Sequence, residues 1–208
     1  TRIHLTQIDE DGNINWEYKS PTDKWRFAVT DIIQLKDGGL VMSTGWGYKW
    51  YTLTRWHPML LKLNSDHNIE WETAFREESG NVHNRVNRIF QTEDEGFIAG
   101  GHLLDVNDNA SQEDHWDFVA YLWKVSETGD SLWSRYYQIV ENKTDFHQIQ
   151  DIERCPVFVG EAQDEDPEEG EPSQQAWIFK VDKYACLIPG CQLLDDVEEP
   201  PHEKVQYQ

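Results

Sequence analysis

The stretch "LLKLNSDHNIEWET", residues 60–73, decides the fold because the same pattern returns elsewhere in the chain. It consists of a short apolar segment, a polar turn and a tryptophan. The pattern appears again as "LTQIDEDGNINWEY" at 5–18 and as "LWKVSETGDSLWSR" at 122–135. A fourth copy, "IFKVDKYACLIPGC" at 178–191, keeps the apolar segment but has no tryptophan and carries two cysteines. A repeat on this scale indicates repeated supersecondary units.

The copies share one register. An aliphatic residue ends each apolar segment, at spacings of 55, 62 and 56 residues, and a tryptophan follows it in the first three copies. A lysine precedes the aliphatic residue in copies two to four, and Gln7 takes its place in copy one. Because the indoles return at one position of the unit, we interpret them as packing residues. The equivalent aliphatic residues are Ile8, Leu63, Val125 and Val181, the lysines are Lys62, Lys124 and Lys180, and the tryptophans are Trp16, Trp71 and Trp133.

Each unit also contains a second element after the tryptophan. It reads "DIIQLKDGGLVMSTG" from Asp31 and "RIFQTEDEGFIAGG" from Arg88, and a shorter, degenerate version reads "IQDIERCPVFVG" from Ile149. The apolar runs are short, rich in Val, Ile, Phe and Trp, and bounded by Asp, Gly and Asn, which is typical of strands joined by hairpin turns. Helical periodicity is not sustained anywhere.

These patterns predict an all-β fold with about four strands in each unit. Antiparallel four-stranded units in series are typical of β-propeller blades, so we expect about three blades and one closing strand. The repeat divides the chain into blades at 3–57, 58–119 and 120–176, a closing strand at 177–192 and an acidic linker or tail at 193–208.

Three segments between the repeated elements are expected to be loops. The aromatic segments 45–58, "GWGYKWYTLTRWHP", and 102–117, "HLLDVNDNASQEDHWD", are interpreted as long loops that join one blade to the next. The acidic segment 161–175, rich in Pro and Gly, is interpreted as a mobile loop. In the third unit, Cys155-Pro156 stands where the other units have a glycine turn, which leaves its second hairpin an open question.

The composition excludes some classes of function. The net charge is −21, from 39 acidic and 18 basic residues, so the chain should repel nucleic acid and anionic membrane surfaces. No run approaches the ~20 apolar residues of a membrane span. Aromatic residues reach 12%, with ten tryptophans, whereas disordered chains are poor in aromatics.

The repeated lysine–aliphatic–polar hairpin with its tryptophan, followed by the Asp-Gly-Gly turn and an apolar strand, resembles the propeller-type repeats of large secreted proteins from Bacteroidota. The closing "WIFKVDKYACLIPGC" is similar to the end of such arrays, where a cysteine pair flanks Pro-Gly after the last strand. The resemblance covers roughly residues 3–192. It implies the C-terminal part of an array, export by type IX secretion, and a location outside the cell or on its outer surface.

The same resemblance implies a disulfide between Cys186 and Cys191 that closes a small loop around Pro189-Gly190. In the chain-entropy model a loop this short contributes only about 2 kcal/mol. Two reduced thiols remain the alternative, and a zinc site is disfavoured because no second Cys or His pair lies nearby. Cys155 is left over and is interpreted as a small apolar residue in a strand.

Two groups of residues are candidates for binding. In "DEDGN", the residues Asp9, Asp11 and Asn13 begin like a calcium loop, although the acids are lost in the equivalent turns, and turn formation is the competing interpretation. Aromatic residues outside the repeating positions could stack on sugars or grip a protein partner, or could cover a junction between blades. These aromatic residues are Trp46, Tyr48, Trp50, Tyr51, Trp56 and Trp116.

The sequence favours a non-enzymatic scaffold or recognition module with a protein partner or with further blades of a longer chain. It contains no zinc-protease, nucleophile-elbow or phosphate-loop motif. Acids and His115 in 113–117 could be imagined as a metal or acid–base site, and the competing interpretation is a solvated loop. A carbohydrate-binding or carbohydrate-cleaving propeller is the alternative function, because 39 acids supply many candidate carboxylate pairs.

Overall fold

The computed structural model contains strands and turns and no helix in the residues it describes. The described residues are 3–20, 29–50, 53–75, 85–105, 117–137, 143–152, 155–165, 172–182 and 185–186. Within them there is accordingly no helix that could cross a membrane. The prediction of an all-β chain made of antiparallel four-stranded units is confirmed for this part of the chain.

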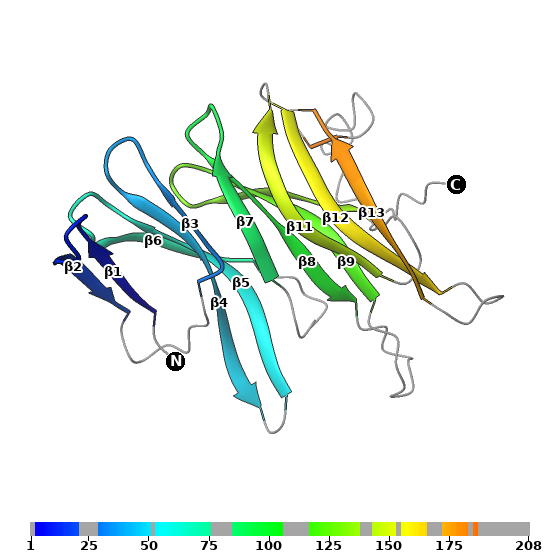
Figure 1. Ribbon diagram of the computed structural model, residues 1–208, viewed down its shortest axis with the longest axis horizontal. Coiled ribbons are helices and arrows are strands. Elements are labelled where there is room, and N and C mark those ends of the chain that lie inside the picture. Colours follow the sequence, from blue (N-terminus) through cyan, green and yellow to red (C-terminus); the bar gives the residue numbers. More distant parts are fainter. Residues whose placement is uncertain are drawn as a thin grey trace.

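The first six strands form two antiparallel sheets (Figure 1). Sheet I is the pair β1 and β2, and sheet II has the order β3-β4-β5-β6. The strands are β1 (His4–Ile8), β2 (Ile14–Lys19), β3 (Asp31–Gln34), β4 (Leu40–Trp50), β5 (Leu53–Leu63) and β6 (Ile69–Ala74).

The last seven strands form two further antiparallel groups. Their hydrogen bonds connect them as one seven-stranded sheet in the order β13-β12-β11-β9-β8-β7, with β10 paired to β9. We call its two antiparallel parts sheet III, which is β7-β8-β9-β10, and sheet IV, which is β11-β12-β13. A single parallel bridge between Lys143 and Phe118 links β11 to β9 and so joins the two groups. The strands are β7 (Arg85–Gln91), β8 (Phe97–Asp105), β9 (Asp117–Val125), β10 (Ser131–Tyr137), β11 (Lys143–Ile152), β12 (Cys155–Glu165) and β13 (Pro172–Lys180).

The sequence repeat and the sheets are offset by half a unit. The predicted unit groups the strands of 60–75 with those of 86–101, but the former belong to sheet II and the latter to sheet III. Repeat boundaries at 57/58 and 119/120 therefore fall inside β5 and β9. A repeat fixes the period of a chain but not its phase, so the sequence alone could not locate the break between sheets.

The prediction that 45–58 is a loop between blades is wrong. Residues up to Trp50 belong to β4, those from Leu53 belong to β5, and these two strands pair with each other within sheet II. The predicted loops at 102–117 and 161–175 are likewise shortened by strands, since β8 runs to Asp105 and β12 to Glu165. Residues 106–116, 166–171 and 187–208 lie outside the described part of the chain.

The second hairpin of the third unit is present despite its degenerate sequence. Strands β11 and β12 pair antiparallel from Lys143 opposite Gln163 to Ile152 opposite Cys155. Only two residues separate the strands, whereas the equivalent turns of sheets II and III, Leu35–Gly39 and Thr92–Gly96, take five residues. The missing glycine turn therefore shortens the connection without abolishing the hairpin.

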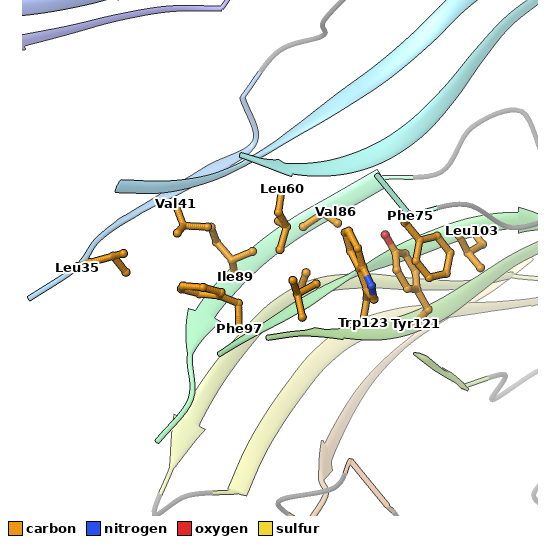
Figure 2. Close-up of a cluster of buried hydrophobic side chains, with 12 residues drawn as sticks. Leu35, Val41, Leu60, Phe75, Val86, Ile89, Phe97, Leu103, Tyr121 and Trp123 are labelled. Atoms are coloured by element: carbon orange, nitrogen blue, oxygen red, sulfur yellow. The ribbon is translucent and has the colours of Figure 1, made fainter. Parts of the chain in front are cut away.

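The sheets lie face to face in chain order, and each interior sheet is apolar on both faces (Figure 1). Side chains alternate along a strand, so Val41 faces sheet III while the next residue, Met42, faces sheet I. Between sheets II and III, Phe75 lies 5.1 Å from Tyr121 and 5.3 Å from Trp123, ring centroid to ring centroid (Figure 2). Covering both faces explains the continuous apolar runs in β5 and β9.

The four repeated polar turns have the same backbone geometry. In the turn Asn64–Asn68, the His67 amide donates to the Asn64 carbonyl at 2.9 Å, and the Asn68 amide donates to the Asn64 side chain at 3.0 Å. The fourth residue of each turn has positive φ, which glycine adopts most easily. The turns are Asp9–Asn13, Asn64–Asn68, Ser126–Asp130 and Asp182–Cys186, and their positive-φ residues are Gly12, His67, Gly129 and Ala185.

Candidate functional site

The β4–β5 hairpin projects beyond the rest of sheet II. Strand β3 pairs with β4 only from Leu40 to Ser43, and β6 pairs with β5 only from Met59 onward. Among the described strands, the ladders of 44–50 and 53–58 join these two segments only to each other, and the Pro58 carbonyl also accepts the Phe75 amide at 2.8 Å. We call this two-stranded segment the ribbon. In Figure 1 the ribbon points downward, away from the turns between β3 and β4.

The ribbon contains most of the aromatic residues predicted to bind a partner. Its register sets Trp46 opposite His57, Tyr48 opposite Arg55 and Trp50 opposite Leu53. Trp56 stands opposite a glycine, Gly47. The structure therefore brings four predicted residues, Trp46, Tyr48, Trp50 and Trp56, into one paired segment. Tyr51 and Trp116 lie outside the described residues, as do the side chains of the ribbon aromatics.

Acidic strand ends lie on the same side of the sheets as the ribbon. In a meander, successive connections alternate between the two ends of the strands, so the β4–β5, β8–β9 and β12–β13 connections share one end. Strand β8 ends at Asp105, β9 begins at Asp117, and β12 ends at Glu165. The backbone of the ribbon therefore lies on the same side of the molecule as these strand ends of sheets III and IV (Figure 1).

The opposite side, where the repeated turns lie, is built around intramolecular contacts. The indole of Trp16 in sheet I stacks on His67 in sheet II, with ring centroids 3.9 Å apart. One sheet further on, the Trp71 indole donates to the Glu127 carbonyl at 2.9 Å. A Cβ atom placed on Gly129 would lie 2.8 Å from the Trp71 ring. Each indole thus covers the positive-φ turn of the next sheet.

The contact between sheets III and IV involves the equivalent turn, Asp182–Cys186, but different side-chain interactions. Trp133 packs against the cluster between sheets III and IV that contains Ala185, the positive-φ residue of the last turn. Tyr137 donates its hydroxyl to the Ala185 carbonyl at 2.6 Å. The sequence identified the repeating tryptophans but not their contact surface, because that surface lies more than fifty residues further along the chain.

The repeated lysines behave differently in each sheet. Lys124 is buried and its ammonium group contacts the Asp94 carboxylate at 2.7 Å and the Thr92 hydroxyl, so it ties β9 to the β7–β8 turn. Lys62, also buried, contacts the Glu70 carboxylate at 3.1 Å instead. Lys180 is exposed in sheet IV, which has no equivalent Asp-containing turn. Partial burial would raise the pKa of Asp94, but hydrogen bonds from Lys124 and Thr92 and the lysine charge lower it overall.

The proposed calcium residues form a turn. The Asp9 carboxylate accepts hydrogen bonds from the Asp11 amide at 3.0 Å and from the Asn13 amide at 2.8 Å, and its second oxygen accepts from the Asn13 side chain at 3.0 Å. The Asn13 side-chain bond is the largest cause of a lowered pKa at Asp9. Among the described residues no group of three His, Cys, Asp or Glu side chains is arranged to hold a metal ion. A calcium ion here stays a prediction.

A shallow polar depression lies between the β3–β4 and β7–β8 turns. Lys36 lines it from sheet II, and Gln91, Thr92, Glu93 and Glu95 line it from sheet III. The side chains that line it carry charges of both signs, and they include no histidine, cysteine or serine. It offers no arrangement of nucleophile and base, and we assign it no chemistry.

Cys186 lies at the end of the last turn and is buried, 3% exposed. Its amide donates to the Asp182 carboxylate at 2.9 Å. Cys191 and the side chain of Cys155 lie outside the described residues, so the pairing of Cys186 with Cys191 stays a prediction. A scan of protein-family models and a search of curated proteins find no match to this chain.

Proposed function

We propose that the chain is a non-enzymatic recognition scaffold that binds a protein partner through the ribbon. The observation that carries the proposal is the extension of β4 and β5 beyond both of their neighbours in sheet II. Tryptophan and tyrosine are enriched at the centres of protein interfaces because they bury large areas with few rotatable bonds.

The stacking of sheets supports a propeller-like array. Sheets II and III are four-stranded meanders packed face to face in chain order, which is how blades follow one another. Propellers typically have 4–8 blades. We therefore propose that the described sheets belong to a larger array, within a longer polypeptide or a multi-chain assembly.

The secretion proposal depends on the cysteines. A disulfide that involves Cys186 fits an oxidising compartment, such as the outer cell surface reached by type IX secretion. Intact-mass measurement of the native protein, before and after reduction and alkylation, tests the Cys186–Cys191 pair. We expect two cysteines to become alkylated only after reduction, and peptide mapping to join Cys186 with Cys191. A pair involving Cys155 would contradict the assignment.

The partner proposal is tested with two ribbon variants, Trp50→Ala and Trp56→Ala. Cross-linking in material from the native source identifies the partner, and binding of that purified partner is then measured to each variant. We expect at least ten-fold weaker binding for the ribbon variants. Ile178→Ala is the matched control, because Ile178 is 71% exposed on β13, away from the ribbon. Equal losses for ribbon and control variants would contradict the proposal.

A carbohydrate ligand is the second candidate, favoured because the acidic residues Asp105 and Asp117 are at strand ends on the same side of the sheets as the ribbon. Aromatic residues stack on sugar rings, and acids bind the hydroxyl groups around them. A glycan array with the same Trp50→Ala and Trp56→Ala variants separates the candidates. A specific sugar signal that both variants lose would favour this candidate over the protein partner, and the absence of any sugar signal would remove it.

A further inference from the structure

The third strand of each sheet has a different environment in sheet I than in sheets II and III. Strand β5 pairs with β4 and β6, and β9 pairs with β8 and β10. Strand β1, which has the equivalent sequence, pairs only with β2 in the part of the chain that the structure describes. One edge of β1 therefore presents unpaired backbone groups.

The side-chain exposure at the end of β1 also differs from that of the equivalent strands. Ile8 is 61% exposed, whereas its equivalents Leu63 and Val125 are fully buried. An apolar residue that is exposed in sheet I at a position buried in sheets II and III indicates a surface left uncovered by the described residues.

The internal repeats identify the cover. In sheets II and III, the hairpin just before the third strand supplies the paired neighbour, and a glycine of its turn approaches the end of that strand. A Cβ atom on Gly39 would lie 2.7 Å from the Leu63 carbonyl, and one on Gly96 would lie 2.7 Å from the Val125 carbonyl. The equivalent carbonyl in sheet I belongs to Ile8.

We propose that the free edge of β1 accepts a β-hairpin of the β3–β4 type, located immediately before β1 in a longer polypeptide. The inference rests on the proposed array and names one of its contacts. Within the described residues every hairpin of this type, β3–β4, β7–β8 and β11–β12, already pairs with its own third strand, so a second copy of the chain has none to donate. The strand order hairpin-then-third-strand holds in all three sheets.

The turn between β1 and β2 is also uncovered, at the position where a tryptophan of the preceding sheet covers the equivalent turns of sheets II and III. Its positive-φ residue, Gly12, has no atom within 4 Å of a Cβ position, whereas the equivalent Gly129 is covered by Trp71. His67, equivalent in sheet II, is covered by Trp16. A further sheet before sheet I would place an indole on the Gly12 turn, as Trp16 lies on His67 and Trp71 lies on Gly129.

The test is an extended chain in which residues 30–55 are copied in front of Thr1. The 55-residue spacing makes Thr1 equivalent to Trp56, so Arg55 followed by Thr1 reproduces the register of sheet II. The copied Leu40 then stands opposite Ile8, as Leu40 stands opposite Leu63. We expect amide hydrogens on the free edge of β1 to exchange at least about ten-fold more slowly than in the present chain.

Two controls make the result specific. An extension with the same composition in scrambled order should leave β1 exchange unchanged. In the extended chain, Ile8→Asp should abolish the protection, while the same substitution in the present chain should leave its thermal midpoint unchanged because Ile8 is exposed. Unchanged exchange with the ordered extension, or equal protection with the scrambled one, would overturn the proposal.

Intact mass of the protein from its native source tests the location of the hairpin. A polypeptide that continues before Thr1 with a hairpin-like sequence supports the proposal, and a mature 24.5 kDa chain that begins at Thr1 overturns it. These readouts do not involve the Trp50 and Trp56 variants. A negative result for the hairpin therefore does not contradict partner binding through the ribbon. Likewise, the result of the Trp50 and Trp56 binding measurements does not bear on the hairpin at the β1 edge.

Discussion

The turns Asp9–Asn13 and Ser126–Asp130 have the same hydrogen bonds and opposite surroundings. In both, the fourth residue is a glycine with φ near 90° and the first side chain accepts the fifth amide. The second turn is covered by the indole of Trp71, and the first has open space beside its glycine. Local sequence therefore determines the shape of a turn, while its neighbour determines how much that turn contributes to stability.

The largest effect expected from this comparison comes from the indole itself. Trp71→Ala should lower the free energy of unfolding by about 3 kcal/mol, at the lower end for buried aromatics because the ring is half-buried. The variant loses the contact with Phe97 and the hydrogen bond to Glu127. Urea denaturation measures the change, and Ile178→Ala is the control, with an expected change within about 0.5 kcal/mol. Equal losses of unfolding free energy for the two variants would contradict a stabilising contact of Trp71 between sheets II and III.

A matched pair of glycine substitutions tests the turns directly. Gly12→Ala should cost about 1 kcal/mol, from the positive φ alone, because there is room for the methyl group. Gly129→Ala should cost about 2–3 kcal/mol, since its methyl group also collides with Trp71. Thermal unfolding of both variants checks the order. The comparison fails if Gly12→Ala is the more destabilising substitution.

A smaller effect is expected at the Lys124–Asp94 contact. The pKa of Asp94 is lowered in the folded chain, so the ionised carboxylate stabilises the fold above its unfolded pKa of about 3.9, and this contribution is lost as the pH falls through the folded value. Because the Asp94 side chain is 63% exposed, solvent screening limits Asp94→Asn to about 0.5 kcal/mol at pH 7.

Stability curves from pH 7 to pH 2 check this contact. The difference between Asp94→Asn and the parent chain should shrink as the carboxylate protonates. Glu95→Gln is the control on the same turn, because the Glu95 carboxylate contacts Gln91. A constant difference for Asp94→Asn down to pH 2 would exclude the ion pair as its cause.

The smallest effect concerns the first turn. Asp9→Asn should leave the fold at neutral pH nearly as stable as before, because Asn64 fills the equivalent position and accepts the same amide hydrogen bonds. Asp9→Ala removes the acceptor and should be the less stable of the two. The lowered pKa of Asp9 means that its ionic contribution disappears on acidification. Hydrogen exchange at the Asn13 amide distinguishes the variants.

Strands and turns were predictable from the sequence because their causes are local. The Asp, Asn and Gly residues of 9–13 and 64–68 adopt the turn through bonds among themselves. The segment 45–58 was predicted as a loop because it is a long aromatic segment between the repeated elements. In the structure residues 45–50 and 53–58 lie in strands that pair with each other, and that pairing is a contact that composition does not reveal.

Contacts between sheets were not predictable for a different reason. Trp71 was identified as a packing residue, but its partner Gly129 lies in a turn of the next repeat and carries no side chain to indicate it. The candidate site was predictable as a set of aromatic residues. Their common segment became visible only with the register of β4 and β5.

Between sheets II and III, chain length varies at only one end of the strands. Leu40 is 23 residues from Leu63, whereas the equivalent Phe97 is 28 residues from Val125, and the difference falls in the β4–β5 and β8–β9 connections. The four repeated polar turns at the other end keep five residues each, and the turns of sheets II and III are covered by the ring of the preceding sheet's tryptophan. Insertions and fused tags should therefore be tolerated at the ribbon end, while a one-residue deletion at the turns should disturb two sheets at once.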